Sequence, residues 1–379
     1  MFPRLLYVGD VPVEASYHGS ALLHRLLSDY PPDRLTIIET ATESDPARRL
    51  PKINYLSHPI GKARWLNTRF HPYVVAWFTK TGERQAPKIL QSVNGRGLES
   101  VLTVAHGFGW LAAADIARKR EVPLHLIVHD DWPRVVNIAP RFRQKLDERF
   151  ANVYRQAHSR LCVSPAMSRF YEERYGAPAQ VIYPSRAADC PDFDAPPVND
   201  DKPFTIAFAG TINSDGYIHA LKALQDALKP AGGRLLIFGP NQFGLDDPNT
   251  EHRGLVSSTQ LLTRLREEAH ALFVPMSFAG CDRVNMQMAF PSKLADYTAT
   301  GLPLLIYGPS YCSAVIWARE NPGVAEVVEN QADLNNAINR LASDPSHRFA
   351  LGKHALTTGR EYFTHNRAQQ LFVSALKSA

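Results

Sequence analysis

A serine, a lysine and an aspartate stand at helical spacing in the segment 290–308, which reads FPSKLADYTATGLPLLIYG. Pro291 is favoured in a first helical turn, where its missing N–H costs nothing, and the Gly-Leu-Pro sequence predicts the helix end. Ser292 and Lys293 would then lie at a helix N-terminus, where unpaired N–H groups and a cation bind anions such as diphosphates. Asp296 follows one turn later and could accept hydrogen bonds from two sugar hydroxyls. The same residues also fit a capped surface helix with solvated charges.

This segment resembles the nucleotide-sugar segment of the retaining GT-B glycosyltransferases of the large "glycosyl transferases group 1" type. That family has an acidic residue five positions before a Gly-x-Pro, so the resemblance implies that Asp296 binds the nucleotide ribose. The family also has a second acidic residue eight positions earlier, which holds the donor sugar. Here that position is Met288, a departure from the family pattern, and Asp282 in the expected loop 278–289 is the candidate substitute.

The length and cysteine content describe a two-domain protein with reduced thiols. A chain of 379 residues is long enough for two domains, each with its own core. Its four cysteines are scattered, without a CxxC pair or a histidine at ligand spacing, which favours a cytoplasmic protein over a disulfide framework or a zinc site. We expect no signal peptide, and no apolar run approaches the roughly 18 residues of a spanning helix.

The net charge of +5 is concentrated in the first half of the chain. A basic half suggests an acidic partner, such as the phospholipid headgroups of the cytoplasmic membrane face, although solvated arginines would give the same composition. No nucleic-acid-binding module is visible, so no nucleic acid partner is expected.

Short apolar strands alternate with amphipathic helices in both halves, which predicts an α/β fold with parallel sheets. A proline-rich stretch at 183–203 separates the halves. Together with the resemblance, this pattern implies the GT-B fold, in which two Rossmann-like domains face each other across a cleft. The predicted domains are an acceptor-side domain (1–185), a nucleotide-sugar domain (186–360) and a C-terminal helix (361–379) that crosses back to the first domain.

Histidines follow two of the expected strands in the first half. His106 ends TVAH and His129 ends LIVH, and the carboxyl ends of neighbouring parallel strands meet at one edge of a sheet. The resemblance implies that His129 reaches the donor sugar, so His129 and Asp130 are the predicted catalytic residues. An imidazole can hydrogen-bond a sugar hydroxyl or stabilise a developing charge. Gly19 and Ser20, at the first helix, and His106 are assigned to the acceptor side of the cleft. Alternatively, either histidine serves only local structure.

In the second half the resemblance places the donor at loops that follow three strands. The residues assigned to it are Gly210, Thr211, Gly239, Leu255 and Val256. The family usually carries an Arg and a Lys after the first of these strands, and this chain has neither there. Lys293 would therefore be the main cation for the diphosphate, with Arg283 as a lesser candidate. No acidic DxD-type cluster is present at a strand end, so we expect no metal ion and no other cofactor.

These features predict a glycosyltransferase that moves a sugar from a nucleotide-diphosphate sugar to an acceptor hydroxyl, with retention of configuration. The acceptor would be a sugar, a lipid-linked molecule or another hydroxyl compound, in the biosynthesis of a polysaccharide or glycoconjugate. Two alternatives stay open. One is a nucleotide-sugar-binding protein without transfer activity, which the change at Met288 suggests, and the other is a nucleotide-sugar epimerase on the same fold.

Basic and aromatic residues are interspersed between Gly61 and Gly97. The aromatic residues are Trp65, Phe70, Tyr73, Trp77 and Phe78. One interpretation is a surface that binds the acceptor or touches a membrane. The other, which we favour from the sequence, is a pair of ordinary helices whose aromatic side chains fill the core.

Overall fold

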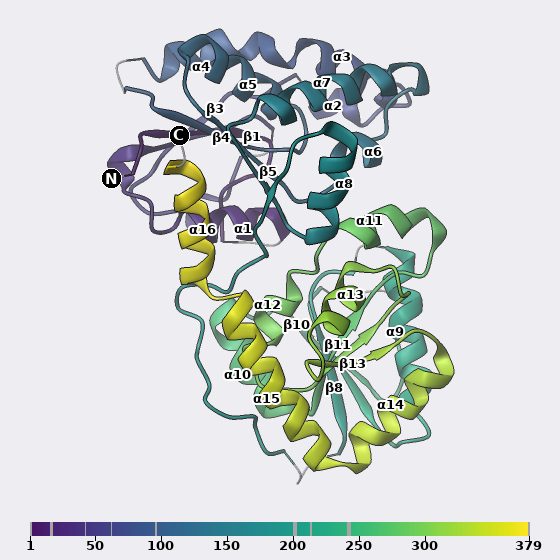
Figure 1. Cartoon of the computed structure of the whole chain (residues 1–379). Coiled ribbons are helices and arrows are strands. Elements are labelled where there is room, and N and C mark those ends of the chain that lie inside the picture. Colours follow the sequence, from purple (N-terminus) through teal and green to yellow (C-terminus); the bar gives the residue numbers. More distant parts are fainter. Residues whose placement is uncertain are drawn as a thin grey trace. The chain divides into compact units, whose positions relative to one another are not determined.

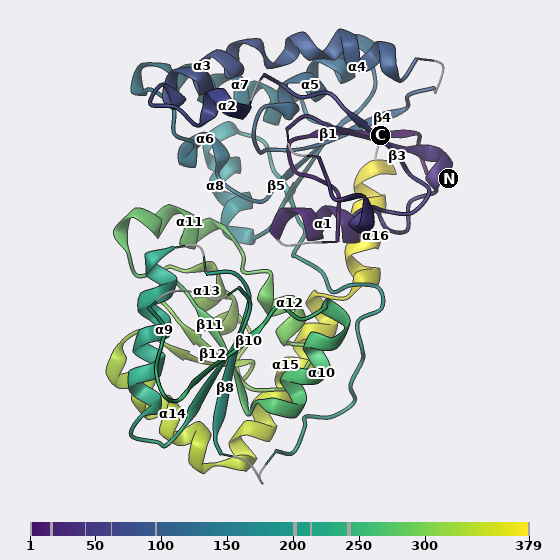
Figure 2. The same ribbon diagram turned by 180° about the vertical axis from the view of Figure 1, so that it is seen from behind.

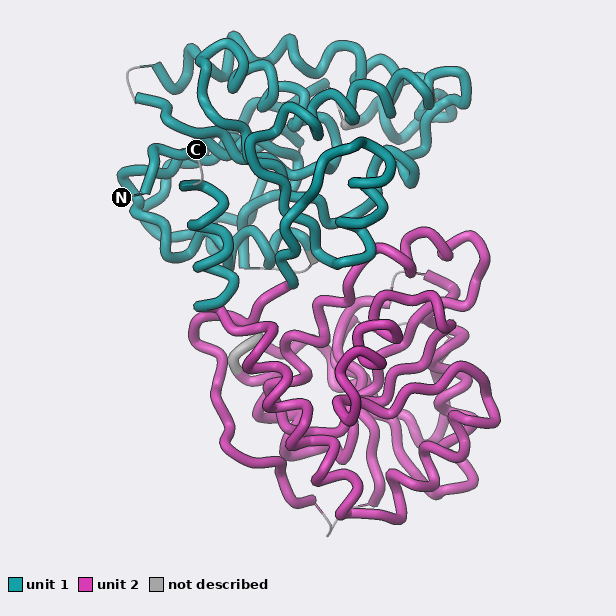
Figure 3. The backbone as a smooth tube through the Cα atoms, viewed as in Figure 1, with its two compact units in different colours: residues 1–183, 366–379 teal, residues 184–365 magenta. Residues whose placement is uncertain are grey.

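The computed structural model describes residues 2–15, 18–41, 43–61, 63–94, 97–199, 203–212, 214–240 and 244–377. The chain divides into two compact units, one of residues 1–183 with 366–379 and the other of residues 184–365 (Figure 3). Each unit contains one parallel β-sheet with helices on both faces (Figures 1 and 2).

The first unit holds a seven-stranded sheet in the order β3-β2-β1-β4-β5-β6-β7. Its strands are β1 (Leu5–Gly9), β2 (Leu35–Glu39), β3 (Asn54–Ser57), β4 (Ser100–Val104), β5 (Leu124–Val128), β6 (Ser159–Cys162) and β7 (Gln180–Val181). All neighbouring strands pair in parallel. Every residue of β1, β4 and β5 is buried, as expected for central strands that helices cover on both faces. The strand order reverses between β1 and β4, and parallel sheets bind ligands at such a point.

Helices of the first unit cover both faces of this sheet. They are α1 (His18–Leu27), α2 (Ala63–Leu66), α3 (His71–Thr81), α4 (Ala86–Ser92), α5 (Gly109–Arg120), α6 (Trp132–Val135), α7 (Arg143–Gln156), α8 (Pro165–Tyr175) and α16 (His365–Lys377), with 3₁₀ turns η1 (Pro32–Arg34), η2 (Pro46–Arg48), η3 (Gly82–Gln85) and η4 (Pro140–Phe142). The C-terminal helix α16 packs beside α1, because the Gln369 side chain donates hydrogen bonds to the carbonyls of Arg25 and Leu26, each 2.9 Å long. The last helix of the chain therefore completes the first unit.

The second unit repeats the same topology with six parallel strands in the order β10-β9-β8-β11-β12-β13. Its strands are β8 (Thr205–Ala209), β9 (Arg234–Phe238), β10 (Thr250–Gly254), β11 (Ala271–Pro275), β12 (Leu304–Tyr307) and β13 (Ala325–Val328). Here the order reverses between β8 and β11, so the loops after these two strands are the expected ligand-binding edge.

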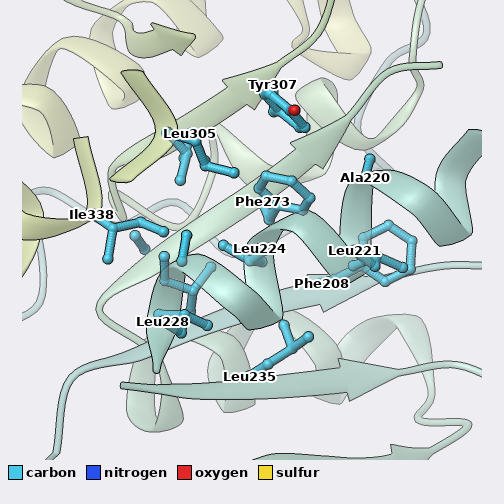
Figure 4. Close-up of a cluster of buried hydrophobic side chains, with 14 of the residues drawn as sticks. Phe208, Ala220, Leu221, Leu224, Leu228, Leu235, Phe273, Leu305, Tyr307 and Ile338 are labelled. Atoms are coloured by element: carbon cyan, nitrogen blue, oxygen red, sulfur yellow. The ribbon is translucent and has the colours of Figure 1, made fainter. Parts of the chain in front are cut away.

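Helices α9 and α14 cover one face of the second sheet, and α10 and α15 cover the other (Figures 1 and 2). The helices are α9 (Asp215–Leu228), α10 (Ser258–Glu268), α11 (Arg283–Met288), α12 (Lys293–Tyr297), α13 (Ser313–Glu320), α14 (Gln331–Ser343) and α15 (Pro345–Tyr362), with the turn η5 (Gly280–Asp282). Side chains from β8, β11 and β12 meet those of α9 and α14 in one apolar cluster, which includes Phe208, Leu224, Phe273 and Ile338 (Figure 4).

The structure confirms the predicted α/β fold with two parallel sheets and a C-terminal helix on the first unit. It corrects the sequence interpretation in two places. The expected loop 278–289 contains the helix α11. Among the five aromatic residues after Gly61 only Phe78 is buried, so the prediction that these side chains fill the core is wrong.

None of the described helices combines the length and the apolar character that crossing a bilayer requires.

Candidate functional site

Three loops at the carboxyl edge of the second sheet pack closely against one another through glycine residues. A Cβ atom on Gly239 would lie only 2.4 Å from the carbonyl oxygen of Gly210, so a side chain does not fit at position 239. The N–H of Gly210 donates to Phe238 (2.8 Å), and the N–H of Gly239 donates to Gly254 (2.9 Å). The loops after β8, β9 and β10 therefore form one continuous edge of closely packed backbone.

The Lys293 side chain lies directly on Gly210. A Cβ atom on Gly210 would stand 2.7 Å from the Cε and 2.9 Å from the Nζ of Lys293. The ammonium also lies 5.0 Å from the ring centre of Phe208 and 5.9 Å from that of Tyr217. It forms no ion pair or hydrogen bond with any described residue, and its partial burial lowers the pKa of Lys293 to about 8. An unpaired cation in this setting is expensive to maintain and marks a candidate anion site.

Tyr297 fixes the helix that carries Lys293. The Tyr297 side chain is buried, and its hydroxyl accepts the N–H of Ala209 (2.6 Å) and is 3.2 Å from the Ala209 carbonyl, to which it donates. Lys293 and Tyr297 lie one turn apart on the same side of α12. The bond to the last residue of β8 therefore holds Lys293 against the adjacent Gly210.

Helix α12 is shorter than its sequence predicts, with only five residues, Lys293–Tyr297. Ser292 is exposed and its side chain makes no capping hydrogen bond. A helix of one turn has little macrodipole, so this helix N-terminus contributes little positive potential to the predicted anion site. The positive charge at this point comes from Lys293 instead, and Pro291 lies half-buried in the preceding turn.

A buried arginine supports the other end of α12. Arg186 donates hydrogen bonds to the Ala295 carbonyl (3.1 Å) and to the Thr298 hydroxyl (3.2 Å). Burial lowers the pKa of the Arg186 guanidinium, and nearby acidic groups, including the Asp296 carboxylate, oppose this effect. Asp296 is half-buried, and its carboxylate interacts electrostatically with this fixed cation. Arg186 is not predicted from the sequence, because it lies in the proline-rich crossing.

Asp282, the candidate substitute for the missing acidic residue, lies against the first turn of α9. Its Oδ2 atom is 3.1 Å from the place that a Cβ atom on Gly216 would occupy. Burial raises the pKa of the neighbouring Tyr217 to about 12, and the Cys312 thiol and the Asp282 carboxylate add to this effect. Because the Tyr217 ring faces the Lys293 ammonium, Asp282 belongs to the same neighbourhood.

The remaining residues predicted for the donor are more scattered. Thr211 is half-buried directly after Gly210. Leu255 is 63% exposed and Val256 is half-buried after β10, at the edge that Gly239 joins. Met288 is buried within α11, and the exposed Arg283 lies over the ring of Tyr311, 4.7 Å from its centre.

In the first unit, the two predicted histidines and Asp130 come together. The Nε2 atom of His129 is 3.1 Å from the Oδ2 atom of Asp130, and the Nδ1 atom of His106 is 3.9 Å from the same oxygen. The two imidazole ring centres are 5.5 Å apart. Partial burial lowers the pKa of His106, with repulsion by His129 in the same direction and the Asp130 carboxylate opposing both. His106 is therefore neutral at pH 7.

The His129 ring packs on the backbone at the start of α1. A Cβ atom on Gly19 would be 2.7 Å from the Cε1 atom of His129, and Ser20 beside it is buried. The Nδ1 atom of His129 is buried and has no hydrogen-bond partner among the described residues. The sequence thus brings Gly19, Ser20, His106, His129 and Asp130 to the same edge of the first sheet.

These side chains could also hold a metal ion. His106, His129 and Asp130 each offer one ligand atom, and the three atoms lie within 4.8 Å of one another. Imidazole nitrogens and a carboxylate oxygen suit zinc and similar divalent ions. The 3.1 Å contact between His129 and Asp130 accounts for the same geometry without an ion, and the absence of a metal requirement stays a prediction.

Asp10 is a residue of this edge that sequence reasoning missed. Its carboxylate accepts the backbone N–H groups of Phe108 (2.6 Å) and Gly109 (3.0 Å) and the hydroxyl of Thr40. Burial raises the pKa of Asp10, while these three hydrogen bonds lower it. Asp10 follows β1 and accepts hydrogen bonds from the turn after β4. It therefore links the two loops at the point where the strand order reverses, and it positions the loop that carries His106.

Known proteins resemble this chain in structure but not in sequence. Models of protein families give no match to the chain, and no curated protein matches it. Solved structures match over the whole length. HepE from Anabaena, in complex with UDP and glucose, has 13% identity and a TM-score of 0.71, with 100% of both chains covered.

Two further structures agree with this result. A UDP-forming α,α-trehalose-phosphate synthase from Burkholderia xenovorans has 13% identity and a TM-score of 0.66, with 99% of each chain covered. WaaG, a glycosyltransferase of lipopolysaccharide biosynthesis, has 12% identity and a TM-score of 0.63, with 99% of this chain and 100% of its own chain covered. These likenesses confirm the resemblance at the level of architecture: the chain has the GT-B fold.

Proposed function

We propose that the protein transfers a sugar from a nucleotide-diphosphate sugar to an acceptor hydroxyl. The observation that carries this proposal is the Lys293 ammonium, which lies against Gly210 at the point where the strand order of the second sheet reverses and has no ionic partner among the described residues. A diphosphate would supply the missing anion. The structures of HepE with UDP and glucose, and with UDP-glucose, support a nucleotide-sugar donor on this fold.

The donor roles follow from the positions of the side chains. Lys293, with the backbone at Pro291 and Ser292, would bind the diphosphate, and Asp296 would accept the ribose hydroxyls. The close-packed backbone at Gly210, Thr211 and Gly239 would allow the donor to approach, and the loop at Leu255 and Val256 would contact the base. Asp282 is the carboxylate near Lys293 that would meet the sugar in place of Met288.

The chemistry would consist largely of positioning and charge stabilisation. Lys293 would stabilise the diphosphate as it departs, and His129 with Asp130 would contact the reacting sugar and orient the acceptor hydroxyl. Retention of configuration, a place in glycan or glycoconjugate biosynthesis and a cytoplasmic location are parts of the same proposal. Since Lys293 supplies the positive charge, no metal ion or other cofactor is required in it.

Removal of the Lys293 charge tests this assignment. We expect UDP or another nucleoside diphosphate to raise the melting temperature of the protein, and the matching nucleotide sugar to raise it further. Lys293→Met should weaken binding of the diphosphate about 10- to 100-fold, since it removes one charge-assisted contact. Lys222→Met on the exposed side of α9 is the matched control. Equal affinity in Lys293→Met and the wild type would refute the site.

A binding protein without transfer activity is the second candidate, and the buried Met288 favours it because an apolar side chain stands where the family has its sugar-binding carboxylate. Release of nucleoside diphosphate from UDP-, GDP- and TDP-sugars in the presence of acceptors distinguishes the two. Binding of a nucleotide sugar without any release would support the second candidate.

A further inference from the structure

The first unit exposes a group of aromatic side chains on α2, α3 and the turn between them. Figure 1 labels the two helices. Their exposed fractions are 38% for Trp65, 54% for Phe70, 52% for Tyr73 and 48% for Trp77. The rings of Trp65 and Trp77 are 5.8 Å apart at their centres, so these two form one patch. Phe78 already fills the core beneath this helix, and the exposed rings are not needed there. Exposed apolar patches of this kind mark interaction sites.

Two segments of the chain give this surface basic residues and contribute no acidic ones. Segments 61–82 and 132–146 contain no Asp or Glu. They meet in the structure, because the Ala139 N–H donates to the Pro72 carbonyl over 3.2 Å. The basic residues of these segments are Lys62, Arg64, Arg69, Lys80, Arg134, Arg141, Arg143 and Lys145.

Three of these arginines remain available for an outside partner. Arg64, Arg69 and Arg141 are exposed and form no ion pair with a described residue. Two of them extend over the aromatic rings, with Arg69 4.9 Å from the ring centre of Phe70 and Arg141 5.4 Å from that of Tyr73. Cations and amphipathic rings are thus interleaved on one surface, which we call the α2–α3 surface.

We propose that the α2–α3 surface, of Trp65, Phe70, Tyr73 and Trp77 with Arg64, Arg69 and Arg141, binds an anionic lipid bilayer. Aromatic side chains insert at the level of the headgroups, and arginines beside them attract anionic lipids. The positive charge favours an anionic bilayer over a protein partner, because three unpaired arginines around four exposed rings complement a surface that is both anionic and apolar. The attachment is peripheral, and it is independent of the glycosyl transfer proposed above.

Vesicle flotation tests this proposal. The wild type should bind vesicles in which about a third of the phosphatidylcholine is replaced by phosphatidylglycerol, and should not bind phosphatidylcholine alone. The double variant Arg69→Glu with Arg141→Glu should bind at least about tenfold more weakly. Phe70→Ser with Tyr73→Ser should weaken binding by about tenfold as well, while the binding that remains still falls with salt.

A matched control separates the surface from net charge. Arg120→Glu with Arg155→Glu changes two exposed arginines outside the two segments and alters the net charge equally. This control should bind vesicles within about twofold of the wild type. Unchanged melting temperatures would show that all variants fold.

Two results would overturn the proposal. The first is a wild type that does not bind anionic vesicles. If the wild type is instead a dimer and the surface variants are monomers, the surface is a protein interface. The second is a control pair that reduces binding as much as Arg69→Glu with Arg141→Glu.

Discussion

Removal of the Lys293 charge should stabilise the unliganded protein while it weakens the binding of a diphosphate. The ammonium is partly buried between Gly210 and the rings of Phe208 and Tyr217 and has no ionic partner among the described residues. A methionine at position 293 keeps the length of the side chain and its contacts with these rings. It removes only the charge. The folded state then no longer bears the free-energy cost of removing the ammonium from water.

The size of the effect follows from the pKa of Lys293, which burial lowers from 10.5 to about 8. This difference corresponds to about 3 kcal/mol at neutral pH, and solvent at the partly exposed ammonium reduces it to about 1–3 kcal/mol. Between pH 8 and 10.5 the unfolded chain binds the proton more strongly than the folded protein. The stability of the wild type should therefore rise with pH through this window, so that the advantage of Lys293→Met shrinks above pH 8.

Diphosphate binding should respond to pH in the opposite direction. The site needs the protonated amine, and with a pKa of about 8 only about a tenth of the free protein carries it at pH 9. The affinity of the wild type for UDP should consequently be about tenfold lower at pH 9 than at pH 7. The Lys293→Met variant has no such group, so any pH dependence that it retains reports the ionisation of groups other than Lys293.

The assay is a thermal melt of wild type, Lys293→Met and Lys222→Met at pH 7 and pH 10, followed by calorimetric titration with UDP at pH 7 and pH 9. We expect Lys293→Met to melt several degrees above the wild type at pH 7, with a smaller difference at pH 10. A variant that melts below the wild type at pH 7, or a wild type whose UDP affinity has the same pH dependence as the variant, would refute the reasoning.

Three further substitutions test the geometry around the two sheets. Gly239→Ala should cost about 2–4 kcal/mol and weaken UDP binding, because the new methyl group collides with the Gly210 carbonyl; melting and titration measure both. Asp10→Ala should cost about 2–4 kcal/mol in a denaturant titration, since two buried N–H groups lose their acceptor, and a loss below 0.5 kcal/mol would contradict this role. His129→Ala should lower kcat at least about 100-fold and leave the Kd for UDP unchanged, and parallel loss of both would show that His129 acts only through folding.

Much of the fold is predictable from local sequence patterns. Apolar runs of about five residues between amphipathic helices identify β1, β4 and β5 in the first unit because these strands are buried on both faces. Edge strands that are short or partly exposed escape this criterion. Strand β7 has only two residues, and β13 is only partly buried, so neither carries a continuous apolar run.

The exposed aromatic residues of α3 show a different limit. Trp77 and Phe78 are adjacent in the sequence and equally apolar, yet one is 48% exposed and the other is buried. In a helix such neighbours point about 100° apart, so only the packing of the helix against the rest of its unit decides which ring is covered. Hydrophobicity alone would place both Trp77 and Phe78 in the core, which is correct only for Phe78.

The sequence indicates candidate site residues where they follow a strand or begin a helix, and it misses residues that act on a distant part of the chain. His129 and Lys293 are recognisable because a titratable side chain stands next to a strand end or a helix start. Asp10 also follows a strand, but its role depends on N–H groups about 100 residues later, in the turn after β4. Tyr297 likewise reads as an ordinary core residue until β8 is placed beside it. Both side chains hold the backbone at a point where the strand order reverses. If that backbone positions the donor and acceptor, substitutions at Asp10 and Tyr297 should reduce turnover although neither residue need touch a substrate.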